Sequence, residues 1–173
     1  MGNITGPVEQ ILLTGGFSNN GILEDSLEIV EIKVGANQCV NTLLKDKKSK
    51  LKKARIFHTA NLLPDGRVLI IGGQGQINMT NLGALNSVEI YDPLTMAIVP
   101  SGISLNISRL LHTATTLQNG NILNVGGFTN EKQDEFGFGP ATDKAELIDI
   151  SNITISNAGS LFNEEKIGGH TAT

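Results

Sequence analysis

The sequence is poor in the residues that several common kinds of site require. Its 173 residues include no tryptophan, one tyrosine (Tyr91) and one cysteine (Cys39). A lone cysteine excludes an internal disulfide and a cysteine-rich metal site within the chain. The longest wholly aliphatic stretch, residues 68–71, is far shorter than the roughly 20 apolar residues that a membrane-spanning helix needs. The sequence therefore predicts no disulfide, no cysteine-based metal site and no membrane span.

Positive charge is scarce outside one short segment. The formal net charge is −4, yet residues 45–53 hold six lysines and one aspartate, which leaves the rest of the chain distinctly acidic. Proteins that bind nucleic acid normally show a broad basic face, so the sequence argues against a nucleic-acid partner. We expect the lysine run to be a solvated linker or, alternatively, a contact for an anionic partner.

The remaining composition is that of a globular protein with many turns. Hydrophobic residues make up 39% of the chain and charged residues 17%, which is typical of a folded domain rather than a disordered one. Twenty glycines against five prolines indicate many tight turns, and no helical period of useful length is present. The sequence predicts an all-β protein in which residues 1–173 form a single region.

Two short motifs recur along the chain at matching distances. The tripeptide His-Thr-Ala occurs three times, at intervals of 54 and 58 residues, beginning at His58, His112 and His170. A glycine pair stands 14 residues after each of the first two histidines, at Gly72-Gly73 and Gly126-Gly127, and a further pair occupies positions 15 and 16. Self-similarity at a period of about 50 residues is typical of a repeat architecture.

Each repeat predicts four short β-strands. Asp65-Gly66 and Asn119-Gly120 stand seven residues after their histidines, and such pairs favour two-residue hairpin turns in which both central residues have a positive φ. The apolar, β-forming flanks predict the first two strands. Alternating apolar and polar residues predict a third strand, and a short fourth one follows a turn. The expected strands are 56–63, 67–71, 87–92 and 96–99, then 110–117, 121–125, 144–149 and 153–155, with 26–31 as another third strand.

These repeats resemble the kelch repeat family, in the form that reads R-x-x-H-T-A, then D-G or N-G, then an apolar strand ending in G-G. The matching residues are Arg55, His58, Asp65, Gly66, Gly72 and Gly73, then Arg109, His112, Asn119, Gly120, Gly126 and Gly127. The resemblance covers nearly the whole chain and implies kelch-type β-propeller blades of four antiparallel strands. Two features depart from the family: no tryptophan stands in a fourth strand, and Ile167 replaces the arginine before His170.

The resemblance also implies where the blades begin and end, because the family's H-T-A strand is usually the innermost of its blade. It predicts a partial blade at 8–44, complete blades at 54–100 and 108–157, and the start of a further blade at 167–173. Three units cannot close a ring, since propellers have four to eight blades, so the ring is expected to be incomplete. The open blade edges predict either a longer protein or self-association through those edges.

The three histidines invite interpretation as a metal site. Repeated residues in stacked repeats usually repeat a structural role, however, and we expect His58, His112 and His170 to bond neighbouring backbone groups. We therefore predict no metal site.

Arg55 and Arg109, together with Glu89, Glu146 and Glu28, are the next candidates for chemistry. A buried glutamate beside an arginine is stable only if both are satisfied, so these residues are expected to form ion pairs between strands. Use of the same charges in catalysis is the alternative interpretation.

Galactose oxidase carries a propeller of this repeat superfamily and provides a test for enzymatic activity. Its copper-radical site needs two tyrosines, two histidines and a cysteine, and Tyr91 is the only tyrosine here. The chain also lacks a nucleophile elbow, a phosphate-binding loop, a zinc motif and a calcium-loop motif. We therefore expect no catalytic residues, no cofactor and no enzymatic activity within this chain.

The loops between the second and third strands vary in length and composition, which is typical of the binding face of a repeat protein. They cover residues 17–24, 74–86 and 128–143 and hold four of the six phenylalanines. Exposed aromatic residues would serve as anchors in protein recognition, whereas the alternative is that the rings fold back and cap the blades. The candidate binding residues are Phe17, Asn19, Gln74, Gln76, Phe128, Glu131, Phe136 and Phe138.

The sequence thus favours a non-catalytic kelch-repeat binding scaffold whose loops recognise a protein or, alternatively, a glycan, with the partner unidentified. The alternative is the partial propeller of a galactose oxidase-like enzyme whose catalytic residues lie outside this segment. A degenerate fragment with no function of its own is a third interpretation. Nothing in the sequence indicates a cellular location.

Overall fold

The computed structural model describes residues 8–34, 39–130, 138–160 and 166–171. Over these residues the chain forms fourteen β-strands and no helix, which confirms the prediction of an all-β protein. All strand pairs are antiparallel, and the strands form four sheets of three or four strands each.

In three of the sheets, the strands lie side by side in the order in which that sheet's strands occur along the chain. The first sheet contains β1 (Val8–Thr14), β2 (Ser26–Val34) and β3 (Cys39–Lys50). The second contains β5 (Thr59–Leu62), β6 (Val68–Ile71), β9 (Ser87–Asp92) and β10 (Ala97–Ser104). The third contains β11 (Thr113–Thr116), β12 (Ile122–Val125), β13 (Lys144–Asp149) and β14 (Thr154–Ser160).

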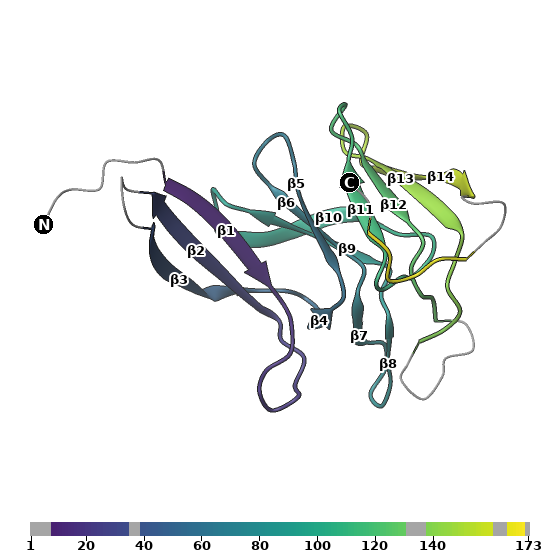
Figure 1. The fold of residues 1–173 in the computed structure, drawn as a ribbon, viewed down its shortest axis with the longest axis horizontal. Helices are drawn as coiled ribbons and strands as arrows, with labels where there is room; N and C mark the ends of the chain where they lie inside the picture. The colour runs from purple at the N-terminus through teal and green to yellow at the C-terminus, as the bar shows by residue number, and fades with distance from the viewer. Residues whose placement is uncertain (1–7, 35–38, 131–137, 161–165, 172–173) are drawn as a thin grey trace, which may run out of the picture.

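A fourth, small sheet was not predicted. It contains β4 (Arg55–Ile56), β7 (Gln74–Gln76) and β8 (Leu82–Ala84), in the order β4-β7-β8. Figure 1 shows the three large sheets side by side along the long axis of the molecule, with the small sheet below the second one.

The second and third sheets have the same register, as the repeats predict. Thr59 pairs with Ile71 in the second sheet, and Thr113 pairs with Val125 at the equivalent position of the third. The strands expected at 87–92 and 144–149 have those bounds, and the two fourth strands are longer than expected. The first sheet lacks an equivalent of β5 and β11 among the described residues, so it has three strands where the others have four.

The hairpin turns differ from the predicted type. Only Gly66 and Gly120 have positive φ, at 88° and 83°, whereas Asp65 and Asn119 do not. The amide of Gly66 donates to the Leu63 carbonyl at 2.9 Å, and the same bond recurs in the third sheet. This is a turn whose last residue alone is left-handed, the geometry of a longer hairpin loop with a bulge.

The core consists of two apolar layers on either side of the second sheet. Because side chains alternate between the faces of a strand, Ile70 packs toward Leu27 and Ile29 of the first sheet. Leu69 and Ile71 pack on the opposite face, in a cluster with Ile122 and Ile148 of the third sheet. Both faces of β6 are therefore buried, which explains its unbroken Val-Leu-Ile-Ile sequence.

Most of the lysine run is not a linker, in contrast to the sequence expectation, and only its last residues lie in the segment 51–54 that connects β3 to β4. β3 extends to Lys50 and pairs with β2 along its length, with a register irregularity between Ser26 and Glu28. The first six residues of the run therefore belong to the edge strand of the first sheet.

Candidate functional site

The glycine pairs bring each repeat against the next one. A Cβ atom on Gly72 would lie 2.9 Å from Cε1 of His112, and one on Gly126 would lie 2.8 Å from Cε1 of His170. Both glycines have a positive φ, near 60°, so two independent constraints exclude a side chain. The glycines of the motif therefore serve the contact between sheets.

The second glycine of each pair donates its amide to the following repeat. Gly73 bonds to the carbonyl of Arg109 at 2.9 Å, and Gly127 bonds to the carbonyl of Ile167 at 2.8 Å. The first sheet makes the same contact through Gly16 and the carbonyl of Arg55, at 2.9 Å. The replacement of arginine by Ile167 leaves this bond intact because only the main chain takes part.

Each histidine ring bonds to a threonine of the preceding sheet. His112 Nε2 lies 3.2 Å from Thr59 Oγ1, and His170 Nε2 lies 3.0 Å from Thr113 Oγ1. His58 Nε2 lies 2.6 Å from Oγ1 of Thr14 at the end of β1. The expected backbone partners are thus replaced by hydroxyls, and the histidines join one sheet to the next.

Burial keeps these rings neutral. The pKa of His112 is lowered to about 3, chiefly by burial and secondly by the charge of Arg109, with smaller effects of the other two histidines. Burial and then Arg55 lower the pKa of His58 to about 4. Burial also lowers the pKa of His170. Neutral rings held by threonine hydroxyls are suited to packing between sheets.

The two arginines form buried ion pairs, as expected. Arg109 is fully buried, and its Nη2 lies 2.7 Å from Oε2 of Glu146. Arg55 is paired in the same way with Glu89. The second carboxylate oxygen of each glutamate accepts a backbone amide, from Asn106 and from Lys52, at 2.7 Å.

Backbone carbonyl groups next to the sheet that holds the paired glutamate also bond to each arginine. Arg55 Nη1 donates to the carbonyl of Gly72 at 2.8 Å, and Arg109 Nη1 donates to that of Gly126 at 2.7 Å. Burial lowers the pKa of both arginines from its ordinary value, against the raising effect of the paired glutamate. Each arginine therefore connects the end of the second strand of a large sheet with the start of the third strand, at Gly72 and Ser87 for Arg55 and at Gly126 and Lys144 for Arg109.

The variable loops lie on one side of the three sheets. Figure 1 shows the β1–β2 loop, the β7–β8 hairpin and the segment that leads into β13 all at the lower edge of the molecule. We call the described part of these loops, residues 17–24, 74–86, 128–130 and 138–143, the loop face. The sheets thus bring together segments that are far apart in the sequence.

The structure divides the predicted binding residues into accessible and packed ones. Phe17, Asn19 and Gln76 are exposed, whereas Gln74 is buried in β7 and is not accessible to a partner. Phe128 is half-buried, and its ring covers Gly168, where a Cβ atom would lie only 2.5 Å away. Phe128 therefore matches the capping alternative. Glu131 and Phe136 lie outside the described residues.

Phe138 belongs to a small aromatic cluster that the sequence did not predict. Its ring centroid lies 5.6 Å from that of Phe128 and 6.4 Å from that of Phe57. Phe57 is 42% exposed and has a φ of 55°, which is unusual for a bulky residue. Its position, beside the histidine of a repeated motif, gave no sign that the side chain would be accessible.

A groove of about 780 Å³ runs between the β1–β2 loop and the β7–β8 hairpin. Exposed apolar side chains line it, above all Met79 at 96% and Ile22 at 62% exposure, together with Ile77 and Leu82. Lys52 and Lys53 stand at its border. These residues were not among the predicted binding residues, although apolar residues within polar loops were a visible signal in the sequence.

In the described ranges of the chain, no three histidine, cysteine, aspartate or glutamate side chains are grouped closely enough to hold a metal ion. Over the same residues, no helix has the length and apolar character required to cross a membrane.

No protein-family model matches the chain, and no curated protein matches it. Among solved structures, 111 chains match. One of them, titled "Structure of YjhT", is 18% identical and has a TM-score of 0.58, and the match covers 85% of this chain. This chain covers 49% of that structure, so it spans about half its length. At this level of identity the likeness concerns the fold alone.

Proposed function

We propose that the chain is part of a kelch-type β-propeller that acts as a non-catalytic scaffold, and that its loop face binds a protein. The observation that carries this proposal is the groove of about 780 Å³ with its exposed apolar lining. An apolar patch with a polar border is typical of protein interaction sites.

The division of roles among side chains supports a scaffold rather than an enzyme. The repeated histidines bond to threonines, and the repeated arginines are neutralised by buried glutamates. These groups are occupied in joining sheets and strands. The accessible groups of the loop face are instead apolar, aromatic and amide side chains, which suit recognition.

The chemistry of the groove indicates the kind of partner. Met79 and Ile22 offer flexible, apolar contacts that adapt to a partner's side chains, while Lys52 and Lys53 add positive charge. A segment that carries apolar anchors and acidic residues fits this combination.

The proposal is tested by comparing two sets of variants against any candidate partner. Met79→Ser combined with Ile22→Ser removes apolar surface from the groove, and Phe138→Ala removes a ring of the aromatic cluster. Leu94→Ser is the matched control, because Leu94 is 94% exposed and lies in the β9–β10 turn, away from the loop face. The measurement is affinity by calorimetry, after thermal melting has shown that all variants are folded.

We expect the groove variant to weaken binding at least tenfold and the Leu94 variant to leave it unchanged. The assignment of the loop face would be contradicted by a partner that binds the Met79→Ser/Ile22→Ser variant and the Phe138→Ala variant as tightly as the natural chain. Equal losses from the groove and control variants would contradict it as well.

A further inference from the structure

We propose that the β7–β8 hairpin presents a preformed anchor, in which Asn78 holds the tip so that Met79 enters an apolar pocket on the surface of a protein partner. This inference rests on the proposed function of the loop face. It adds a positioning residue, Asn78, and the kind of surface that the partner must offer.

The tip of the hairpin is tied together by one side chain. Residues 77–81 connect β7 to β8, and the Ile77 amide donates to the Asn81 carbonyl at 3.1 Å. Oδ1 of Asn78 accepts the amides of Thr80 and Asn81, at 3.0 and 2.9 Å, and lies 3.2 Å from Oγ1 of Thr80. Such bonds from an asparagine to the backbone that follows it fix a local turn. All residues from 76 to 82 are exposed, so these bonds rather than packing hold the tip.

Met79 stands at the apex of this tip. Its side chain is 96% exposed, while its carbonyl accepts Nε2 of Gln76 at 3.3 Å. A side chain with that exposure touches almost nothing in its own chain, so it contributes little to the stability of the fold. It can contribute to binding by leaving water for a pocket of the partner, a transfer that favours association. The flexible, unbranched thioether chain of methionine adapts to pockets of different shape.

The base of the hairpin is braced by the loop that follows β12. β8 is the outer strand of the small sheet, and Asn130 bonds to the backbone of Ala84 in this strand. Asn130 Nδ2 donates to the Ala84 carbonyl at 2.6 Å, and Asn130 Oδ1 accepts the Ala84 amide at 2.5 Å. Because base and tip are both held, the hairpin does not have to become ordered when a partner binds, which removes an entropic cost of association.

Two lysines indicate the chemistry around the partner's pocket. Lys52 and Lys53 are exposed and line the same groove as Met79. Opposite charges that face each other across an interface steer the encounter and fix its orientation. The partner surface that fits is therefore an apolar pocket with carboxylate groups at its border.

Leu94 provides a comparison within the molecule. It is 94% exposed in the β9–β10 turn, where Oδ1 of Asp92 accepts its amide at 2.8 Å. Leu94 is thus also an apolar side chain on a turn held by an acidic or amide residue, but it is not among the residues that line the groove. This turn supplies the matched control for the hairpin.

The test uses probes that have the proposed chemistry. Sulfobutylether-β-cyclodextrin is an apolar pocket with an anionic border, and unsubstituted β-cyclodextrin is the same pocket without the charge. In a chain labelled with carbon-13 at the methionine methyl groups, we expect both probes to shift the Met79 signal saturably. The anionic probe should bind about threefold more tightly than the neutral one. Lys52→Gln combined with Lys53→Gln should abolish this difference.

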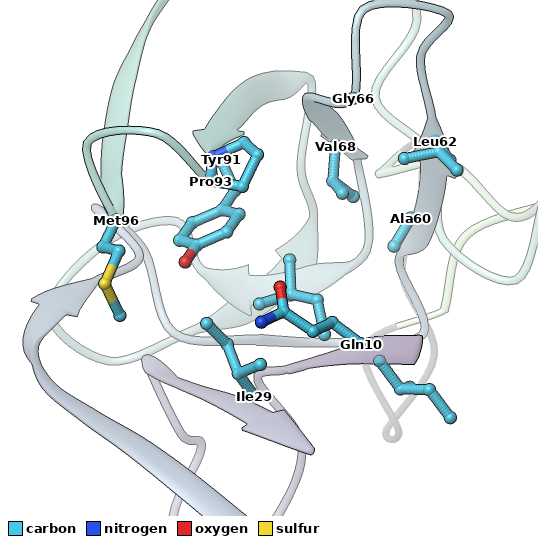
Figure 2. A pocket seen from close by; sticks show the side chains of 11 residues that line it. Gln10, Ile29, Ala60, Leu62, Gly66, Val68, Tyr91, Pro93 and Met96 are labelled. Carbon is cyan, nitrogen blue, oxygen red and sulfur yellow. The ribbon is translucent and has the colours of Figure 1, made fainter. Parts of the chain in front are cut away.

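Met96 is the internal control for the probes. It lines a second cavity, of about 440 Å³, between the first and second sheets, and Figure 2 shows the side chains of Met96 and Tyr91 at this cavity. We expect the Met96 signal to stay in place. A Met96 signal that shifts while the Met79 signal does not would locate the probe at this cavity and overturn the assignment of Met79.

Two substitutions test Asn78 with the neutral probe. Asn78→Ala removes the acceptor, so hydrogen exchange of the Thr80 and Asn81 amides should become about tenfold faster. The dissociation constant of the probe should rise roughly threefold, because the tip must then be ordered on binding. Asn78→Asp keeps an oxygen acceptor and should behave like the natural chain. Both variants should keep the natural melting temperature, and Asp92→Ala should change neither the exchange at the tip nor the binding of the probe.

The inference and the proposed function fail on different outcomes. Equal exchange rates in Asn78→Ala and Asn78→Asp, equal affinity for the two probes, or a Met79 signal that neither probe shifts would overturn the inference. The proposed function fails if Met79→Ser with Ile22→Ser leaves the affinity for a protein partner unchanged, whatever the exchange rates at the tip are.

Discussion

The two contacts between neighbouring large sheets use the same residues but differ in completeness. Where the second sheet meets the third, β5 lies beside β11, and His112 is only 5% exposed. Where the first sheet meets the second, no described strand lies beside β5, and His58 is half-buried. The surroundings of an otherwise identical motif therefore differ between the two contacts, because the described part of the first sheet has three strands and the second sheet has four.

The comparison shows which parts of the repeat depend on a neighbour. His58 bonds to Thr14 at the end of β1, whereas His112 and His170 bond to the first threonines of β5 and β11. Arg55 and Arg109 show no such difference, since both are fully buried. The ion pairs are complete within one repeat, whereas the burial of the histidine is set by the sheet before it.

The largest expected effect comes from the ion pairs, which should respond equally at the two contacts. Arg109→Met leaves Glu146 buried without its partner and should lower the free energy of unfolding by about 3–5 kcal/mol. Arg55→Met should have the same cost, because its surroundings are the same. Urea denaturation at neutral pH measures both. The combined change Arg109→Met with Glu146→Leu, which removes both charges, is expected to recover part of the loss; no recovery would contradict the ion-pair explanation.

The glycines should separate the two contacts. Gly127→Ala places a methyl group 2.7 Å from the Leu110 carbonyl at a φ of +93°, so we expect a loss of about 3 kcal/mol or more. Gly16→Ala has a similar φ but open space, so only the backbone strain of about 1–2 kcal/mol should remain. Thermal and urea unfolding measure the difference. Equal losses at the two positions would refute the open space at Gly16.

A smaller effect is expected from the histidines at acid pH. The pKa values of His58 and His112 both lie below the ordinary 6.5, so each of these rings binds its proton more tightly in the unfolded chain than in the folded one. The stability that the neutral rings provide is complete above about pH 6.5 and is lost as the pH falls toward 4 for His58 and 3 for His112.

His112→Gln should therefore remove a slope of about 1.4 kcal/mol per pH unit from the stability profile between pH 6 and 4.5. His58→Gln should remove a similar slope that ends about one pH unit earlier, near its higher pKa. Urea midpoints measured at half-unit intervals record the profiles, and NMR titration of the rings checks each pKa directly. A ring that titrates near 6.5 would show that it is not buried.

Several features of the fold were predictable because they depend on local sequence. Alternating residues at 87–92 and 144–149 defined two strands with the correct bounds, and the Asp-Gly and Asn-Gly pairs marked the hairpins. The prediction that the lysine run is a linker was wrong for residues 45–50. A run of lysines is not typical of a strand, and these residues belong to β3 because they pair with β2, which the local sequence does not indicate. The small sheet was missed because β4 and β7 pair across about 20 residues of intervening chain.

The site was predictable to a lesser extent. The sequence identified the arginines, histidines and glycines as structural, and it located the loops of the candidate face. It could not show that Gln74 is buried and Met79 exposed, because both stand in the same loop among polar residues. Side-chain accessibility follows from how the β7–β8 hairpin packs on its neighbours.

By itself, the sequence determined the period of the repeat, the all-β class and the residues of each repeated contact, because turn chemistry and strand alternation are short-range properties. Only the tertiary structure decided which strands have open edges, which rings are buried and where the groove forms. Those properties depend on what lies across the interface between two sheets, and an interface joins residues whose separation along the chain carries no local signal.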